Sequence, residues 1–386
     1  KLVEEIKEEK LNESNVELII NAQKKNFSKT FIFDSPNNKI KLKFRKPIKD
    51  CSQMFSFCDY LISIDLSSFD ANNVTNMEKM FYHCKNLKTI IMSNLEAKNL
   101  KNMSFMFASC KNLDKVDLSN LNIENVTNMS NLFNGCENLT NLIITDVKTK
   151  NVINISQMFR RCKQIKKIDL SRLDTRNVTD ISYMFSECES LTDLDISNLN
   201  TQNVTDMSFL FNKCKQLKNL NLSNLNTNVV TNMNNMFNEC LALENIDLSN
   251  FNTENVKEMA EMFSYCPINT LDLSHLNTTN VTNMGGMFMG CGNLTCIDLS
   301  SLDTTNVKDM NNLFSLCENI EKIDLRPLRT DNLENFNYMF NKCTNLNHID
   351  LSNLNIQKGK EYKVEYMFWH CENLKEIVVN ENNENR

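Results

Sequence analysis

The stretch Phe107-Ala-Ser-Cys-Lys-Asn-Leu-Asp-Lys-Val-Asp-Leu-Ser-Asn-Leu-Asn-Ile-Glu-Asn-Val-Thr-Asn-Met-Ser-Asn-Leu-Phe133 decides the fold of this chain. It spans one period of a repeat, because phenylalanine recurs every 26 residues through most of the sequence and a cysteine follows each one three residues later. The repeat phenylalanines are Phe55, Phe81, Phe107, Phe133, Phe159, Phe185, Phe211, Phe237, Phe263, Phe288, Phe314, Phe340 and Phe368. A period of this length indicates one supersecondary unit stacked on copies of itself, so the sequence predicts a solenoid.

Each repeat is expected to contain a short strand. Residues 113–121 have the L-x-x-L-x-L-x-x-L spacing of a leucine-rich repeat. Within them, residues 116–119 alternate apolar and polar side chains, which is the pattern of a strand with one buried face.

The second half of the repeat is expected to contain a short helix. Val126, Met129, Phe133 and Cys136 fall on one stripe of an amphipathic helix, and Thr127 or Asn128 is the expected N-cap. The predicted fold is therefore an α/β repeat: a leucine-rich-repeat-like, right-handed solenoid of about 13 turns, each with a strand and a short helix. The asparagine before Val126, present in most repeats, is expected to form a buried ladder of stacked amides.

Repeats such as Asn203-Val-Thr-Asp-Met-Ser-Phe-Leu-Phe-Asn-Lys-Cys-Lys-Gln-Leu-Lys-Asn-Leu-Asn-Leu-Ser223 resemble the BspA-like leucine-rich repeats. These repeats also occur in mycoplasma surface lipoproteins and in surface-protein families of protists, and the resemblance covers about residues 46–379. Members with a known role are mostly cell-surface proteins that adhere to host or matrix proteins or to other cells. The resemblance therefore implies a binding surface and no catalytic chemistry.

Three regions are predicted along the chain. Residues 1–45 depart from the period and are expected to cap the first turn with a polar helix at 1–12 and strands at 16–20, 30–33 and 40–44. Residues 46–379 form the solenoid, with an insertion near residues 358–360, and residues 380–386 are a polar tail. Because that tail is too polar to cover the last turn, an end-to-end contact through the uncapped turn at residues 377–379 is also expected.

Composition excludes several classes of function. The net charge of -6 argues against nucleic acid as the main partner. No apolar run is long enough to span a membrane. The four histidines belong to different repeats and form no catalytic or zinc motif, and the interrupted methionine columns suit a core better than a metal site. We therefore expect no enzyme activity, no cofactor and no bound metal.

The cysteines leave two interpretations open. Thirteen of the 15 follow the repeat phenylalanine, and Cys296 alone falls on an outward strand position. Unpaired thiols packed in the core are favoured, because each member of such a column is a small buried side chain. Disulfides between successive members are the alternative, and they would indicate an extracellular protein.

The candidate site lies on the outward face of the predicted strands. An aspartate file runs along this face, with a serine two residues later in most repeats. Stacked carboxylates repel, so either local donors or a cationic partner must stabilise them. Ile91 and Ile143 replace aspartate in this file, and apolar residues on a polar face are candidate contacts. The predicted partner-binding residues are therefore Ile91, Ile143, Asp65, Asp117 and Asp169.

Two functions of different class remain open. The favoured one is a surface or secreted recognition or adhesion module that contacts a protein or glycan through its sheet face. The alternative is an intracellular scaffold subunit of a large cytoplasmic or cytoskeletal assembly, an environment that suits many unpaired cysteines.

Overall fold

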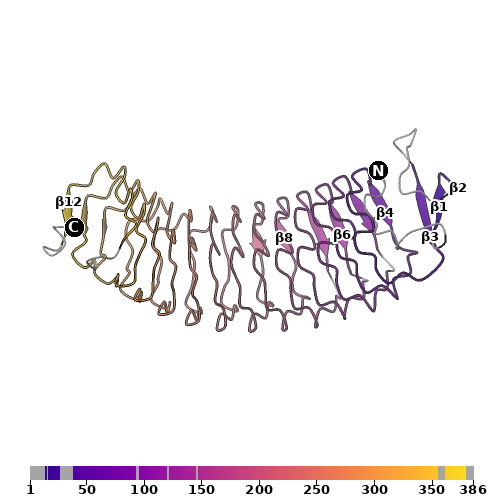
Figure 1. The fold of residues 1–386 in the computed structure, drawn as a ribbon, viewed down its shortest axis with the longest axis horizontal. Helices are drawn as coiled ribbons and strands as arrows, with labels where there is room; N and C mark the ends of the chain where they lie inside the picture. Colours follow the sequence, from indigo (N-terminus) through magenta and orange to yellow (C-terminus); the bar gives the residue numbers. More distant parts are fainter. Residues whose placement is uncertain are drawn as a thin grey trace. The chain divides into compact units, whose positions relative to one another are not determined.

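The computed structural model describes residues 14, 16–26, 38–92, 95–119, 121–144, 147–354 and 361–379. The chain divides into two units, residues 1–177 and residues 178–386. Within each unit the backbone winds into stacked right-handed coils, one per repeat, so the predicted leucine-rich-repeat-like solenoid is confirmed at this level (Figure 1). The structure has about 12 turns rather than the predicted 13.

The first unit begins with a small antiparallel sheet. Its strands β1 (Val16–Ile20), β2 (Gln23–Lys25) and β3 (Ile40–Phe44) lie in the order β2-β1-β3. The predicted strands at 16–20 and 40–44 are present with those bounds, whereas the helix at 1–12 and the strand at 30–33 lie outside the described residues. Phe44 contacts Phe69 with ring centroids 5.5 Å apart, which places this sheet against the first coil.

Short parallel strands form one side of the coils. In the first unit β4 (Ser63–Asp65), β5 (Thr89–Ile91), β6 (Lys115–Asp117) and β7 (Asn141–Ile143) form one four-stranded sheet. The strand β8 (Lys167–Ile168) follows in this unit, and β9 (Asp193–Leu194) belongs to the second. In the second unit β10 (Lys322–Ile323), β11 (His348–Asp350) and β12 (Glu376–Val378) form a parallel three-stranded sheet.

The predicted helices are wrong, because the structure has no helix among the residues it describes. The stripe that predicted them forms consecutive tight turns instead. Around each repeat phenylalanine, the residues two before and two after it have positive φ, as Phe105 (56°) and Ser109 (62°) do around Phe107. A positive φ suits the third residue of a type II turn and is incompatible with a right-handed helix.

Hydrogen bonding between coils explains why turns replace the helix. The N–H of Phe81 donates to the carbonyl of Met106 at 2.9 Å, and the N–H groups of Met77, Lys79 and His83 bond to the following coil in the same way. In a helix these N–H groups would bond to carbonyls of their own segment, and no backbone hydrogen bonds would join neighbouring coils here. The turns therefore join neighbouring coils through the backbone as a sheet does.

The core consists of columns of identical positions. The repeat phenylalanines stack on one another within each unit, with centroids 5.4–5.9 Å apart and ring planes within 15° of parallel. From Phe81 to Phe340 all of them are fully buried, as are the methionine columns beside them. Such interdigitated columns supply the apolar burial that a single coil cannot supply alone.

The cysteines pack in this core as predicted. None of the fifteen forms a disulfide; thirteen are buried, Cys371 is half-buried and Cys296 is exposed. Most column members also bond to the preceding coil: the Sγ of Cys110 lies 3.1 Å from the carbonyl oxygen of Phe81, and the same contact recurs along both units. The thiol is thus a small apolar side chain with one weak donor, and it satisfies a carbonyl inside the stack.

The loop asparagines bond to the backbone of the preceding coil rather than to one another. Asn125 Nδ2 donates to the carbonyl of Lys98 at 2.7 Å, and Asn151, Asn255 and Asn306 make the equivalent bond. These side chains are exposed or half-buried, so the predicted buried amide ladder is wrong. The predicted N-cap Asn128 accepts the N–H of Ser130 at 3.0 Å, which begins a turn and no helix.

Candidate functional site

The sheet of the first unit brings four of the five predicted site residues into one column. In the parallel register Asp65 is the partner of Ile91, and Asp117 is the partner of Ile143. Thr89 of β5 is likewise the partner of Lys115 of β6, which aligns the two pairs. Asp169 follows β8, outside this four-stranded sheet, and is also exposed.

The alternation that places this column outward is clear in β5. Ile91 is 48% exposed, whereas its neighbours Ile90 and Met92 are 9% and 3% exposed. Ile143 is half-buried, so it offers a partner less apolar surface than exposed Ile91 does. The column therefore presents two carboxylates and two isoleucines in alternation, with Ile91 as the more exposed apolar member.

The aspartates are held by a local turn. In each repeat that has the pair, the carboxylate accepts the backbone N–H of the serine two residues later, at 2.9 Å for Asp65, Asp117 and Asp169. Hydrogen bonds from that serine lower the pKa of all three carboxyls, because they stabilise the charged form. The local explanation for the aspartate file thus holds, with serine as the donor, and the carboxylates stay charged and available to a partner.

Two further apolar side chains beside this column were missed. Tyr60 is 86% exposed and Ile62 is 51% exposed, and both lie directly before β4. The signal was present in the repeat: the position of Ile62 is polar in the other repeats, with Lys88 and Asp114 as examples. In and beside the column, the first two coils thus carry three exposed apolar side chains, which the sequence marks only as departures from its own repeat.

A second cluster lies on the turn segments of the first unit. The ring of Phe57 contacts those of Tyr82 and His83, with centroids 5.4 Å and 4.9 Å away. Tyr82 also approaches Phe105, over which Lys79 Nζ lies 5.2 Å from the ring centroid. These rings stand two positions before, or one or two after, a repeat phenylalanine, so the turns expose them while the core phenylalanine stays buried.

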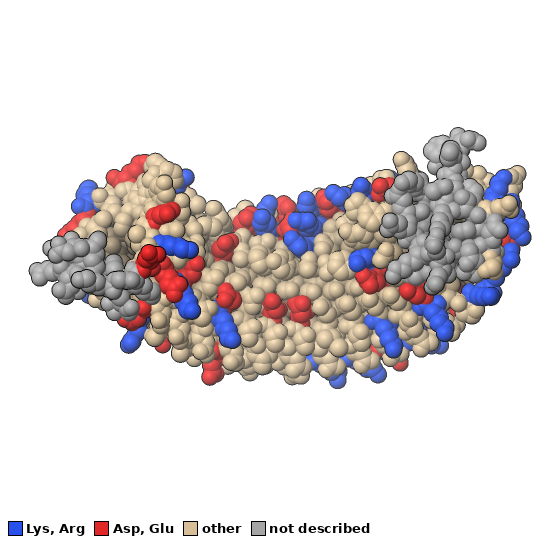
Figure 2. Space-filling view, in the orientation of Figure 1, with Lys and Arg blue, Asp and Glu red and all other residues tan. Residues whose placement is uncertain are grey.

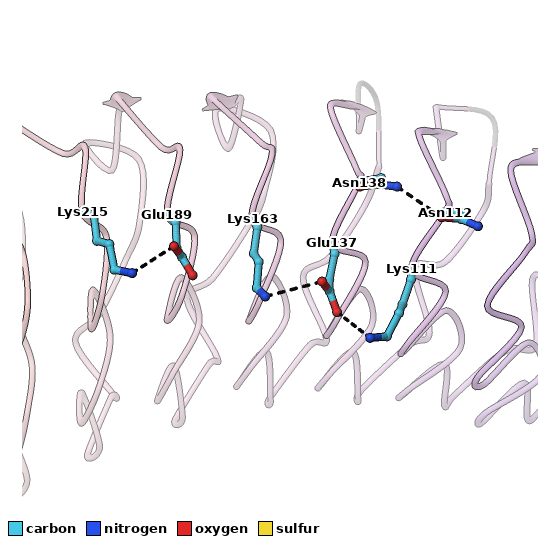
Figure 3. Close-up of polar contacts among 7 residues, drawn as sticks. All are labelled: Lys111, Asn112, Glu137, Asn138, Lys163, Glu189 and Lys215. Atoms are coloured by element: carbon cyan, nitrogen blue, oxygen red, sulfur yellow. Dashed lines mark hydrogen bonds and ion pairs between the residues drawn. The ribbon is translucent and has the colours of Figure 1, made fainter.

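Ion pairs join neighbouring coils at a third position. Figure 3 shows Lys111 and Lys163 reaching Glu137 from the coils on either side, at 2.9 Å and 3.4 Å. In the second unit Lys215 pairs with Glu189 at 3.0 Å. Exposed pairs of this kind contribute little each, about 0–1 kcal/mol, so we assign them to coil registration rather than to binding.

The last described coil exposes core positions that the preceding coils bury. Ile377 is 45% exposed, whereas its register partner Ile349 is buried, and Val379 is 44% exposed. Phe368 is half-buried, whereas its counterpart Phe340 is fully buried. Ile377 and Val379 belong to the turn that is expected to make the end-to-end contact.

Among the described residues, no group of three or more His, Cys, Asp or Glu side chains is placed to hold a metal ion. None of the described segments is a helix long and apolar enough to cross a membrane. A shallow hollow of about 400 Å³ in the second unit is lined by uncharged polar side chains, among them Asn198, Gln202 and Asn224.

Comparison with known proteins identifies the repeat and the fold. A family model described as "Mycoplasma protein of unknown function, DUF285" matches residues 49–167, 114–219, 189–295 and 267–382. No curated protein matches the sequence. A leucine-rich repeat protein from Bacteroides ovatus has a similar solved structure, with 19% identity and a TM-score of 0.52 over 94% of this chain and 92% of that one.

Two more distant structures share the repeat class. A leucine-rich cell surface protein from Faecalibacterium prausnitzii is 18% identical, with a TM-score of 0.42 over 88% of this chain and 84% of that one. The functional domain of InlJ from Listeria monocytogenes, described as including a cysteine ladder, is 14% identical, with a TM-score of 0.33 over 83% and 63% of the two chains. At these identities the likeness concerns the fold alone.

Proposed function

Because the chain belongs to the DUF285 family of mycoplasma proteins of unknown function, we propose its function from its surface: a non-enzymatic recognition or adhesion module, displayed at a cell surface or secreted, that binds a protein partner. The contact is the sheet face of the first unit. The observation that carries this proposal is the exposure of Ile91 between Asp65 and Asp117, next to Tyr60 and Ile62.

The composition of this face suits a protein better than a glycan. Affinity at protein interfaces concentrates in a few apolar or aromatic anchors inside a polar rim. Here Ile91 and Ile143 are the anchors, Tyr60 and Ile62 add apolar surface near Ile91, and Asp65 and Asp117 belong to the rim. Side-chain amides, which suit the hydroxyl groups of a glycan, gather instead around the hollow of the second unit.

The test is a double substitution that restores the repeat pattern. Ile91→Asp with Ile143→Asp makes the column uniformly acidic, a state that the second unit tolerates at Asp247, Asp272 and Asp298. The thermal stability of the double variant should stay nearly unchanged. The surface proteins that the parent captures should bind it more weakly, by about 1 kcal/mol or more per anchor.

The matched control is Leu241→Glu, which replaces an exposed leucine of the second unit with a carboxylate side chain. It should leave binding unchanged. If the double variant and the control retain the same partners as the parent, the sheet face is not the interface. If the double variant unfolds, the outward assignment of the two isoleucines is wrong.

An intracellular scaffold subunit is the second candidate, and the free cysteines favour it. Its contact would be the last coil, where Ile377 and Val379 are exposed and a further coil or a second molecule can add to β12. Ile377→Lys with Val379→Lys should then abolish assembly and leave sheet-face binding intact. Localisation of the full-length protein by fractionation separates the two candidates.

A further inference from the structure

The two units carry opposite net charge. Residues 1–177 contain 28 Lys and Arg against 20 Asp and Glu, a net charge of +8. Residues 178–386 contain 14 Lys and Arg against 28 Asp and Glu, a net charge of -14. The overall charge of -6 therefore conceals a strongly basic half and a strongly acidic half.

The basic charge is most concentrated on the antiparallel sheet β2-β1-β3 and the segment after it. The described residues 16–26 and 38–49 contain eight Lys and Arg and one acidic residue, Glu17. Figure 2 shows blue side chains gathered at this end of the first unit. Lys24, Lys43 and Arg45 all form ion pairs with Glu17 within 4 Å, so a single carboxylate is shared by three cationic side chains.

The lysines of this sheet form an exposed row. Lys24 of β2 and Lys41 of β3 are both register partners of Ile19 in the central strand β1. Among the described residues no ion pair joins Lys41 to an acidic group. The row therefore presents cations two strands apart, with a half-buried isoleucine between them.

The acidic counterpart is the aspartate column of the second unit. Asp247, Asp272 and Asp298 occupy the same position in three successive coils, and each accepts the N–H of the serine two residues later at 2.9 Å. The outward residues two positions before them are uncharged: Asn245, Thr270 and Cys296. The same position holds a lysine at Lys115, Lys167 and Lys322, whereas Ser63, Thr89 and Asn141 of the first unit are uncharged.

The spacings of the two surfaces match for a physical reason. Paired strands lie about 4.8 Å apart, so Lys24 and Lys41 are separated by about 10 Å across β1. Successive coils repeat at a similar distance, which places Asp247 and Asp298 about 10 Å apart as well. Both spacings follow from backbone hydrogen bonding, so Lys24 and Lys41 can face Asp247 and Asp298 at the same separation.

We propose that the basic sheet β2-β1-β3 of one molecule docks on the Asp247–Asp272–Asp298 column of a second copy of the same chain. The charge complementarity of the two surfaces selects a second copy as the partner. The contact is independent of the sheet-face recognition proposed above, because it uses neither Ile91 nor Ile143. Hydrogen bonds from serine lower the pKa of the three aspartates, which keeps the column charged in mildly acidic solution.

A charge-swap experiment on the full chain tests the contact. The first variant reverses the sheet with Lys24→Glu, Lys41→Glu and Lys43→Glu, which share one face of the sheet. The second reverses the column with Asp247→Asn, Asp272→Asn and Asp298→Asn together with Asn245→Lys and Thr270→Lys. Asparagine keeps the turn, since Asn221 accepts the N–H of Ser223 at 3.0 Å in the same position of another coil.

Light scattering after size exclusion at low salt should show that the parent associates as its concentration rises. In 0.5 M salt the affinity of this association should fall at least ~10-fold, because salt screens exposed charges. Each variant alone should be monomeric, and the equimolar mixture should associate again. The control Lys88→Glu, Lys101→Glu, Lys150→Glu, with the same change in net charge elsewhere on the first unit, should behave like the parent.

The exposed thiol of Cys296 provides a second readout. Lys41→Cys should form a disulfide-linked dimer with Cys296 under mild oxidation at low salt, and Cys296→Ser should abolish that dimer. A parent that stays monomeric at ~100 µM and low salt overturns the proposal, as does association that both reversed variants retain. A monomer that binds vesicles of anionic lipid through the lysine row overturns it too, because the sheet then has another partner.

Discussion

At the scale of single residues, the repeat uses short side chains to bond to nearby backbone groups. The cysteine thiol donates to a carbonyl of the preceding coil, the aspartate accepts the N–H of its serine, and the loop asparagine caps another carbonyl. With six glycines and four prolines in 386 residues, the loops cannot rely on those residues for their turns. These side-chain bonds supply the same constraint.

The aspartate column predicts a particular acid response. Its carboxyls have a lower pKa in the folded protein than in the unfolded chain, to about 2 for Asp324 beside Arg326. The folded state therefore binds fewer protons, so this stabilisation is present above the unfolded pKa near 4 and is lost as pH falls through the folded pKa. The urea midpoint should be flat from pH 7 to about 5 and fall between about pH 4 and 2.

The variant Asp324→Asn should show a smaller fall over that window than the parent, because it removes the largest of these shifts. Ser223→Ala serves as the control, since the backbone N–H of Ser223 bonds to Asn221, an amide that does not titrate. A midpoint that falls equally in Asp324→Asn and the parent contradicts this account.

The thiols should be reduced and slow to react while the protein is folded. Burial raises the pKa of the Cys240 and Cys291 thiols to about 12, so they are protonated at neutral pH and are poor nucleophiles. A thiol reagent should label Cys296 first and half-buried Cys371 next, with the rest reacting only in denaturant. Mass spectrometry that finds disulfides between successive column members would contradict the packing role.

At the scale of elements, the repeat phenylalanine sits in consecutive turns where the sequence pattern predicts a helix. Both structures bury residues spaced three and four apart, so the apolar stripe fits either one. They differ in the hydrogen bonds of the backbone N–H groups. In a helix these groups bond to carbonyls of the same helix, whereas in the turns alternate N–H groups donate to carbonyls of the next coil. A left-handed conformation costs an ordinary residue about 1–2 kcal/mol, and two residues per coil adopt it.

A glycine substitution distinguishes the two elements by its sign. In the turns Ser109→Gly should raise the free energy of unfolding by about 1 kcal/mol, because φ is 62° there and glycine carries no penalty. In a helix the same change would lower it by about 0.5–1 kcal/mol. The neighbouring Ala108→Gly, at a residue without positive φ, should destabilise the protein, and chemical denaturation measures both.

At the scale of the whole molecule, each coil contacts only its neighbours within a unit, so stability is close to a sum of coil and interface terms. The array also tolerates small changes of period. The 25-residue step to Phe288 leaves the bridges from Glu258 to Asn283 and onward intact. The predicted insertion near residues 358–360 lies outside the described part, and the bridge from Asn335 to Lys363 continues the ladder beyond it.

Removing one complete coil should therefore leave a folded protein. Deletion of residues 204–229 joins Asn203 to Val230 and keeps every column in register. The variant should unfold cooperatively, with an m-value lower by roughly 7%, the share of residues removed. Deletion of residues 204–216, half a coil, should abolish folding because phenylalanine, cysteine and strand positions no longer align. Equal stability of the two deletions would refute the nearest-neighbour description.

The sequence by itself determined the solenoid, the core columns, the packed thiols and the outward direction of Ile91, because stacked copies bury the same positions and a strand alternates its faces. The tertiary structure alone decided between helix and turn, since the choice depends on hydrogen bonds to a neighbouring coil that no local pattern contains. It also decided which departures from the repeat matter. Tyr60 and Ile62 become candidate contacts only when their exposure near β4 is known. The opposite charges become a candidate interface only because the structure places the lysines in one row of a sheet and the aspartates in one column.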